Sequence, residues 1–137
     1  MYQALDLADP TVSVLLADDD TVRELNARWR GIDEPTDVLS FPAHTPESLP
    51  ENPGHLGDVV ISIPCAERYT QSGDHRRRMA LELNVDPDEL SWSLVDEVSF
   101  LFVHGLLHLL GYDHTHLEEE ARMRSAELRL WRILTSP

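Results

Sequence analysis

The chain has 137 residues, a length typical of one domain around a single hydrophobic core, and residues 1–137 are interpreted as a single domain. Its 25 acidic residues outnumber its 11 basic residues, all of them arginine, and the formal net charge of -14 argues against a broad nucleic-acid-binding face. With one cysteine, Cys65, no signal peptide and no apolar run long enough to cross a bilayer, the sequence excludes an internal disulfide and favours a cytoplasmic protein without a membrane partner.

A strand followed by a helix is predicted for the first part of the chain. Residues 11–17 are β-branched and apolar and end at an acidic cluster, which predicts a strand. Asp20 or Thr21 then caps a helix that continues to Arg30, and Gly31 ends it. Three apolar residues of this helix have the spacing of a face turned toward the core: Val22, Leu25 and Trp29.

Two more strands and a second helix are predicted next. Residues 38–41 form a short strand that Pro42 stops, because proline lacks the N–H that a strand ladder needs. The segment 43–55 is rich in Pro, Glu and Ser and is interpreted as a loop, whereas the apolar run 59–63 predicts a strand buried on both faces. The following helix covers residues 64–73, with a proline in its first turn and a glycine at its end.

An irregular stretch then separates this helix from the rest of the chain. Residues 74–85 are polar and arginine-rich with weak periodicity, and we interpret them as an insertion of loop or fraying helix. Its run of three arginines, residues 76–78, is expected on a solvated face of the protein.

The remainder of the chain is predicted to form two helices. Asp86 as N-cap and Pro87 at the first helical position begin a helix that continues into a histidine motif. From Phe100 onward this helix is apolar nearly all round, which places it at the centre of the domain. A last helix covers about residues 117–134, acidic in its first turns and basic in its last, as the helix dipole favours.

Three histidines inside the apolar region form the most informative motif. His104 and His108 are four residues apart, so on a helix they project from one face and both imidazoles reach one ion. Gly111 ends the helix because glycine can adopt the left-handed conformation, and His114 then approaches the same ion from outside the helix. Three neutral nitrogen ligands with a fourth position open to water are typical of a catalytic zinc site. We therefore predict one Zn²⁺ ion bound by these histidines.

The histidine motif also has other interpretations. A lone histidine on an apolar face is more often a hydrogen-bonded core residue, but three buried imidazoles among Leu, Val and Phe would lack partners. Metzincin proteases share the histidine spacing, and there a glutamate after the first histidine serves as general base. Gly105 occupies that position here, so protease chemistry lacks its proton acceptor. Asp113 is a candidate to orient a ligand or to hold the turn, and His116 lies outside the motif spacing.

The histidine run belongs to a wider pattern in the sequence. Residues 104–114 read His-Gly-Leu-Leu-His-Leu-Leu-Gly-Tyr-Asp-His. Three further blocks accompany them: Trp29-Arg30-Gly31, Pro35-Thr36-Asp37-Val38-Leu39-Ser40-Phe41-Pro42 and Leu56-Gly57-Asp58-Val59-Val60-Ile61. In order and spacing these blocks resemble the YbeY family of bacterial metal-dependent, single-strand-specific endoribonucleases, whose signature the histidine run matches at each fixed position.

The resemblance carries specific expectations. It implies an α+β fold, with a small mixed β-sheet packed with helices and a central apolar, zincin-like helix that carries the His-x3-His motif. It implies that His104, His108 and His114 bind zinc and that Arg30 lies near the metal and matters for activity. It further implies a zinc-dependent endoribonuclease acting in 16S rRNA 3'-end maturation and 70S ribosome quality control. The partners would be single-stranded ribosomal RNA and the ribosome or its small subunit, with no DNA.

Two departures from the family and two functional alternatives accompany these expectations. The family usually carries a strand and a helix before the segment that matches residues 11–17, whereas only about ten residues precede it here, so we expect either a sheet without that edge strand or a truncated sequence. Residues 74–85 are interpreted as an insertion. From the residues alone, Arg30 suits paired hydrogen bonds to phosphate oxygens, but it equally suits a helix C-terminus, where it complements the dipole. The alternatives are a metallohydrolase of another substrate, phosphoester or peptide, and a ribosome-assembly factor whose zinc is mainly structural.

Overall fold

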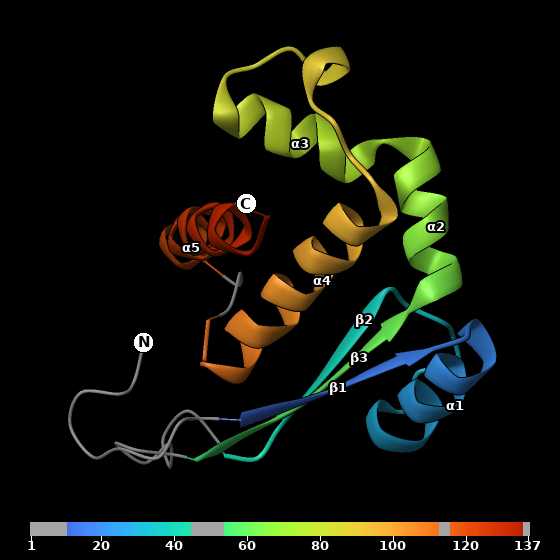
Figure 1. Ribbon diagram of the computed structural model, residues 1–137. Coiled ribbons are helices and arrows are strands. Elements are labelled where there is room, and N and C mark those ends of the chain that lie inside the picture. Colours follow the sequence, from blue (N-terminus) through green and yellow to red (C-terminus); the bar gives the residue numbers. More distant parts are fainter. Residues whose placement is uncertain (1–10, 45–53, 113–115, 136–137) are drawn as a thin grey trace.

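A small mixed β-sheet with helices on both faces forms the centre of the fold (Figure 1). The computed structural model describes residues 11–44, 54–112 and 116–135, in which the chain forms three strands and five α-helices. In chain order the elements are β1 (Thr11–Ala17), α1 (Asp19–Arg30), β2 (Val38–Pro42), β3 (His55–Ser62), α2 (Ile63–Ser72), α3 (Asp74–Leu83), the 3₁₀ turn η1 (Pro87–Glu89), α4 (Leu94–Leu109) and α5 (Leu117–Thr135). This arrangement confirms the expected α+β fold.

The strand order is β1-β3-β2, so β3 is the central strand of the described sheet. β1 is parallel to β3, and β2 is antiparallel to it. The side chains of residues 59–61 are at most 4% exposed, which confirms the prediction of a strand buried on both faces. The strand begins at His55, earlier than predicted, because His55 pairs with β1 and because Gly57 and Asp58 pair with both neighbouring strands.

Different helices cover the two faces of the sheet. Successive side chains of a strand point to opposite faces, so neighbouring residues of β3 contact different layers. On one face Val60 and Leu39 pack with Val22 of α1. On the other face the backbone of α4 lies against Val59 at Gly105. α4 has seven buried residues along its length, which confirms the expected central apolar helix.

The ends of α1 follow local signals, although its first residue differs from the prediction. The carboxylate of Asp18 accepts a hydrogen bond from the backbone N–H of Thr21 at 2.8 Å and caps the helix, so the cap is two residues earlier than Asp20. Gly31 ends the helix with a φ of 72°, as predicted. The prediction that Trp29 faces the core is wrong: its side chain is 64% exposed, since it lies at the rim of an open hollow.

The stretch 74–85 is ordered as a helix over most of its length, which corrects the prediction of loop or fraying helix. α3 covers Asp74–Leu83, and Asn84, with a φ of 58°, ends it. Met79 and Ala80 are fully buried, so the helix is fixed by tertiary packing that its weak periodicity did not reveal. Arg78 departs from the expected solvated face, because its guanidinium pairs with the buried carboxylate of Glu127. That the stretch is an insertion relative to the family stays a prediction.

The start of α4 also differs from the prediction. Asp86 and Pro87 begin only the single turn η1, and the chain is not helical again until Leu94. Ser93 and Asp96 form a capping box at that point, in which each side chain accepts a hydrogen bond from the other residue's backbone. The later start follows from this stronger cap. None of the helices in the described residues combines the length and apolar character that crossing a membrane requires.

Candidate functional site

A polar groove of about 620 Å³ lies where α4, β2 and the end of α1 meet. Its described lining residues are Arg30, Thr36, Asp37, Val38, Ser40, Pro42, His104, His108, Gly111 and Tyr112. The structure therefore brings Arg30, His104 and His108, three of the five predicted site residues, into one groove. The other two, His114 and Asp113, lie outside the described residues.

The two histidines of α4 direct their outer ring nitrogens toward each other. Nε2 of His104 and Nε2 of His108 are 3.1 Å apart, and the ring planes are inclined by 79°. Nδ1 of His108 lies 3.1 Å from the backbone oxygen of Tyr112. A carbonyl oxygen only accepts hydrogen bonds, so this Nδ1 carries the proton, and the Nε2 of the neutral ring presents a lone pair to the groove.

This arrangement fits a metal ligand pair. Two nitrogen lone pairs 3.1 Å apart repel each other unless a proton or a cation lies between them. Nitrogen ligands held about 2.0–2.1 Å from one tetrahedral zinc ion are about 3.4 Å from each other, close to the observed separation. Within the described residues no three His, Cys, Asp or Glu side chains gather as a metal site, and the third expected ligand, His114, lies outside them. The zinc site therefore stays a prediction.

A buried carboxylate lies behind the histidine pair. Glu127 of α5 is 2% exposed; its Oε2 is 3.6 Å from Nδ1 of His104, and its Oε1 accepts a hydrogen bond from Arg78 at 3.1 Å. Burial raises the pKa of Glu127, but His104 and Arg78 outweigh it and hold the pKa below its usual value. The sequence motifs did not single out Glu127. The available signal was its spacing of four from the buried Met123 and Trp131 on the apolar face of α5.

The position between the histidines is filled by close packing of α4 on the sheet. A Cβ atom at Gly105 would lie 2.7 Å from a methyl group of Val59 and 3.1 Å from the hydroxyl oxygen of Ser40. The Ser40 hydroxyl donates a hydrogen bond to the Gly105 carbonyl at 2.9 Å, which fixes the helix to β2. A side chain larger than hydrogen therefore fits at this position only if Val59 and its neighbours shift.

The remaining polar groups of the groove come from α1 and β2. Arg30 is in the last turn of α1 and is exposed, and it lines the same groove as the two histidines of α4. Asp37 lies at the start of β2, where its Oδ1 accepts hydrogen bonds from the backbone of Val38 at 2.8 Å and from Thr36 at 3.3 Å. Because that oxygen is committed to the local backbone, Asp37 is a turn-forming residue of the groove wall.

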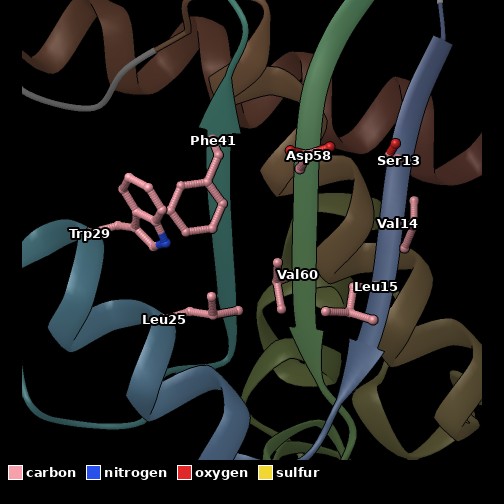
Figure 2. A pocket seen from close by; sticks show the side chains of 8 residues that line it. All are labelled: Ser13, Val14, Leu15, Leu25, Trp29, Phe41, Asp58 and Val60. Carbon is pink, nitrogen blue, oxygen red and sulfur yellow. The ribbon is translucent and has the colours of Figure 1, made fainter.

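A second hollow, of about 470 Å³, lies on the opposite face of the sheet, and α1 and all three strands contribute to it (Figure 2). It is lined by Ser13, Val14, Leu15, Leu25, Trp29, Phe41, Asp58 and Val60. Apart from Ser13 and Asp58 these side chains are apolar or aromatic, so few groups can orient a polar substrate. The groove with the histidines is therefore the candidate site.

A family model and the sequence relatives point to the same family. A family model described as endoribonuclease YbeY matches residues 2–135. A protein named endoribonuclease YbeY from Heliobacterium modesticaldum is 40% identical over 136 residues, covering 92% of this chain and 70% of the relative. One of the same name from Paramagnetospirillum magneticum is 42% identical over 133 residues, covering 93% and 70%. The solution structure of TM1509 from Thermotoga maritima aligns with a TM-score of 0.49 and 27% identity, covering 93% of this chain and 73% of that one.

Proposed function

Because this chain belongs to the YbeY family, we propose that it is a metal-dependent endoribonuclease that cleaves single-stranded RNA in the groove between α4 and β2. The observation that carries the proposal is the pair of imidazole nitrogens, 3.1 Å apart, in the same groove as a guanidinium. Cleavage of a phosphodiester is promoted by a Lewis acid and by a cationic hydrogen-bond donor, because both stabilise the negative charge that develops on the phosphate oxygens in the transition state.

The residues of the site have separate roles in this proposal. His104 and His108, together with His114 outside the described residues, would hold one zinc ion. When bound, the ion would polarise a phosphoryl oxygen and lower the pKa of a water molecule. The Tyr112 carbonyl favours the His108 tautomer that has its proton on Nδ1 and its lone pair on Nε2.

Arg30 suits the binding of the phosphate. A guanidinium donates paired hydrogen bonds to phosphate oxygens and stabilises added negative charge. Among the described lining residues of the groove Arg30 is the single arginine, so in a chain with a net charge of -14 the attraction for RNA is local to the site. A positive charge confined to the groove is consistent with the binding of single-stranded RNA there.

The biological setting is part of the same proposal. The relatives carry the name endoribonuclease, and the family resemblance extends this to 16S rRNA 3'-end maturation and 70S ribosome quality control in the cytoplasm. The partners would then be ribosomal RNA and the ribosome or its small subunit. Asp113, outside the described residues, keeps its proposed place as a group that orients a ligand.

An RNA cleavage assay with controlled metal content tests the proposal. Zinc-loaded protein is incubated with end-labelled single-stranded RNA and with the same RNA as a duplex, before and after chelation and readdition of metal. We expect cleavage of the single strand only, loss of cleavage on chelation, and more than about a thousandfold loss in His108→Ala, since a Lewis acid contributes several kcal/mol.

Other outcomes identify the alternatives. Cleavage that survives both chelation and His108→Ala would contradict the assignment of the site. Hydrolysis of a peptide or of a small phosphodiester, but not of RNA, in a substrate panel with zinc, manganese and nickel would identify another metallohydrolase. Stoichiometric zinc binding without any hydrolysis would favour a mainly structural ion.

A further inference from the structure

Three helices meet behind His104 through a line of charged side chains. Nδ1 of His104 on α4 is 3.6 Å from Oε2 of Glu127 on α5, and Oε1 of Glu127 accepts a hydrogen bond from Arg78 on α3 at 3.1 Å. Glu82, one turn further along α3, lies 3.8 Å from Arg78. The line therefore joins the candidate site to the segment 74–85.

We propose that Glu127 and Arg78 are positioning residues, which hold the His104 ring with its Nδ1 proton toward α5 and its Nε2 lone pair toward the groove. Glu127 would do this by accepting a hydrogen bond from the Nδ1–H group of His104, and Arg78 by holding the carboxylate in place through its own hydrogen bond. The inference rests on the proposed function only in that the group facing Nε2 is taken to be a zinc ion.

The surroundings of Glu127 support its role in orienting the His104 ring. Its Oε2 is fully enclosed, and among the described residues it has no hydrogen-bond donor within bonding distance. The ring nitrogen Nδ1 of His104 lies 3.6 Å from this oxygen, slightly beyond hydrogen-bonding distance. A buried, ionised carboxylate oxygen without a hydrogen-bond donor favours a proton on the ring nitrogen that faces it. In the other tautomer of His104 the lone pair of Nδ1 would face the negative charge.

The second ligand candidate is oriented in another way. Nδ1 of His108 donates to the backbone carbonyl of Tyr112, four residues along the chain, so its orientation depends on local structure at the end of α4. The orientation of His104 instead depends on side chains from two other helices, α3 and α5. Carboxylates that orient metal-bound histidines through the outer N–H commonly raise metal affinity about 10–100-fold.

The protein offers a matched control in a second buried carboxylate. Glu97 on α4 is fully buried, but both of its oxygens are partnered, one by Nε1 of Trp92 at 3.0 Å and the other by Nδ1 of His75. The His75 ring also stacks on Tyr69, with ring centroids 4.4 Å apart, well embedded in the helical layer. Removing charge from Glu97 tests the loss of a buried carboxylate without touching the groove residues directly.

Nuclear magnetic resonance of the full-length, metal-free protein tests the inference without relying on catalysis. With ¹⁵N-labelled histidine, long-range ¹H–¹⁵N spectra give the tautomer of His104 at a pH where the ring is neutral. We expect the Nδ1–H tautomer in the wild type and a mixture of tautomers in Glu127→Met. Glu127→Gln, which keeps a carbonyl acceptor, should retain most of the wild-type tautomer, and Glu97→Gln should retain all of it even if its melting temperature falls.

Zinc affinity, measured by competition with a chromophoric chelator, gives the second readout. Relative to the wild type we expect affinity about 10–100-fold lower in Glu127→Met, about tenfold lower in Arg78→Met, and unchanged in Glu97→Gln. Melting curves by circular dichroism identify which variants are folded, and Arg78→Met, which leaves Glu127 in place but removes its partner, serves as the test if Glu127→Met is unfolded.

The two measurements distinguish a failure of the proposed function from a failure of this inference. Wild-type protein that binds no zinc overturns the proposed function, while the tautomer measurement still decides the inference. Wild-type protein with His104 in the Nε2–H tautomer overturns the inference, as does a folded Glu127→Met variant with unchanged tautomer and zinc affinity. Equal loss of zinc affinity in Glu97→Gln would also overturn it, because the effect would then follow from general destabilisation.

Discussion

The two faces of the sheet are built from the same three strands but have opposite chemical character. On the α4 face the groove has polar groups that are already held in place, such as the Ser40 hydroxyl on the Gly105 carbonyl and the His108 ring on the Tyr112 carbonyl. On the α1 face the hollow is mostly apolar, and Leu15 at its edge is 50% exposed. Oriented polar groups, rather than the presence of a cavity, distinguish the face that can perform chemistry.

Alternation along single strands produces this difference. In β2, Ser40 lines the groove, whereas its neighbour Phe41 lines the hollow on the other side. Substitutions on the α4 face should therefore change metal binding or cleavage, and substitutions on the α1 face should change only stability or solubility. The following experiments test that division, from the largest expected effect to the smallest.

Removal of the guanidinium from the groove should give the largest effect. Arg30→Ala is expected to lower kcat/KM for RNA cleavage about 10²–10³-fold, because a charge-stabilising donor is lost in the transition state, while zinc affinity stays the same. The matched control is Arg28→Ala, since Arg28 is exposed in the same helical turn with its guanidinium over the Trp29 ring, 5.4 Å from the centroid. Equal losses in both variants would contradict a specific role for the groove arginine.

A methyl group between the histidines should also have a clear effect. Gly105→Ala is expected to lower the free energy of unfolding by about 1–3 kcal/mol, because its Cβ meets Val59 at 2.7 Å and packing must shift. Zinc affinity should fall with it, since α4 carries both histidines. Urea unfolding of Gly105→Ala, of Val59→Ala and of the double variant gives the coupling free energy between the two substitutions. Strictly additive losses would show that the two positions do not touch.

A polar contact on the α1 side should give a smaller, pH-dependent effect. Hydrogen bonds from Arg68 and Ser62 lower the pKa of Asp19 below its usual 3.8, so the ionised group stabilises the folded state. This contribution is present above the usual pKa and is lost as the pH falls through the lowered one. Asp19→Asn should lower the free energy of unfolding by less than about 1 kcal/mol at neutral pH, since the ion pair is partly exposed.

Urea unfolding of wild type and Asp19→Asn as a function of pH measures this contribution. The two curves should converge at acidic pH, where the wild-type carboxylate is also neutral. A difference that is constant down to the lowest pH would mean that the charge of Asp19 is not what stabilises the fold. RNA cleavage at neutral pH should be the same in both proteins.

The smallest effect is expected in the apolar hollow. Leu15→Thr replaces an exposed side chain of β1 by one that also favours strands, so the free energy of unfolding should change by no more than about 0.5 kcal/mol. Cleavage should be unchanged, and solubility should rise because exposed apolar surface is removed. A marked loss of cleavage would break the division between the two faces.

Sequence patterns predicted the elements whose ends are set by local chemistry. Gly31 and Gly73 end helices in the left-handed conformation, and the apolar run of β3 identified the central strand. The prediction failed where several caps compete or where tertiary packing decides. Asp18 rather than Asp20 caps α1, and α3 is helical because Met79 and Ala80 are buried, which its weak periodicity did not indicate.

The candidate site could be predicted only in part. The spacing of His104 and His108 placed both side chains on one face of α4, and the resemblance placed Arg30 nearby; all three lie in the groove, although their roles stay predictions. Glu127 and Arg78 were missed because their relation to His104 exists only after α3, α4 and α5 have packed together. Contacts between distant segments leave no fixed spacing in the sequence.

The close approach at Gly105 has a consequence for redesign. Exchanging this residue for glutamate would restore the letters of a metalloprotease motif, yet a carboxylate there would collide with Val59 and Ser40 before reaching any solvent. The packing of α4 on the sheet would have to change, and this would displace the His104 and His108 rings from their positions in the groove. A designer seeking amide-bond chemistry on this scaffold should therefore bring the proton acceptor from a different strand or loop and leave the contact between helix and sheet intact.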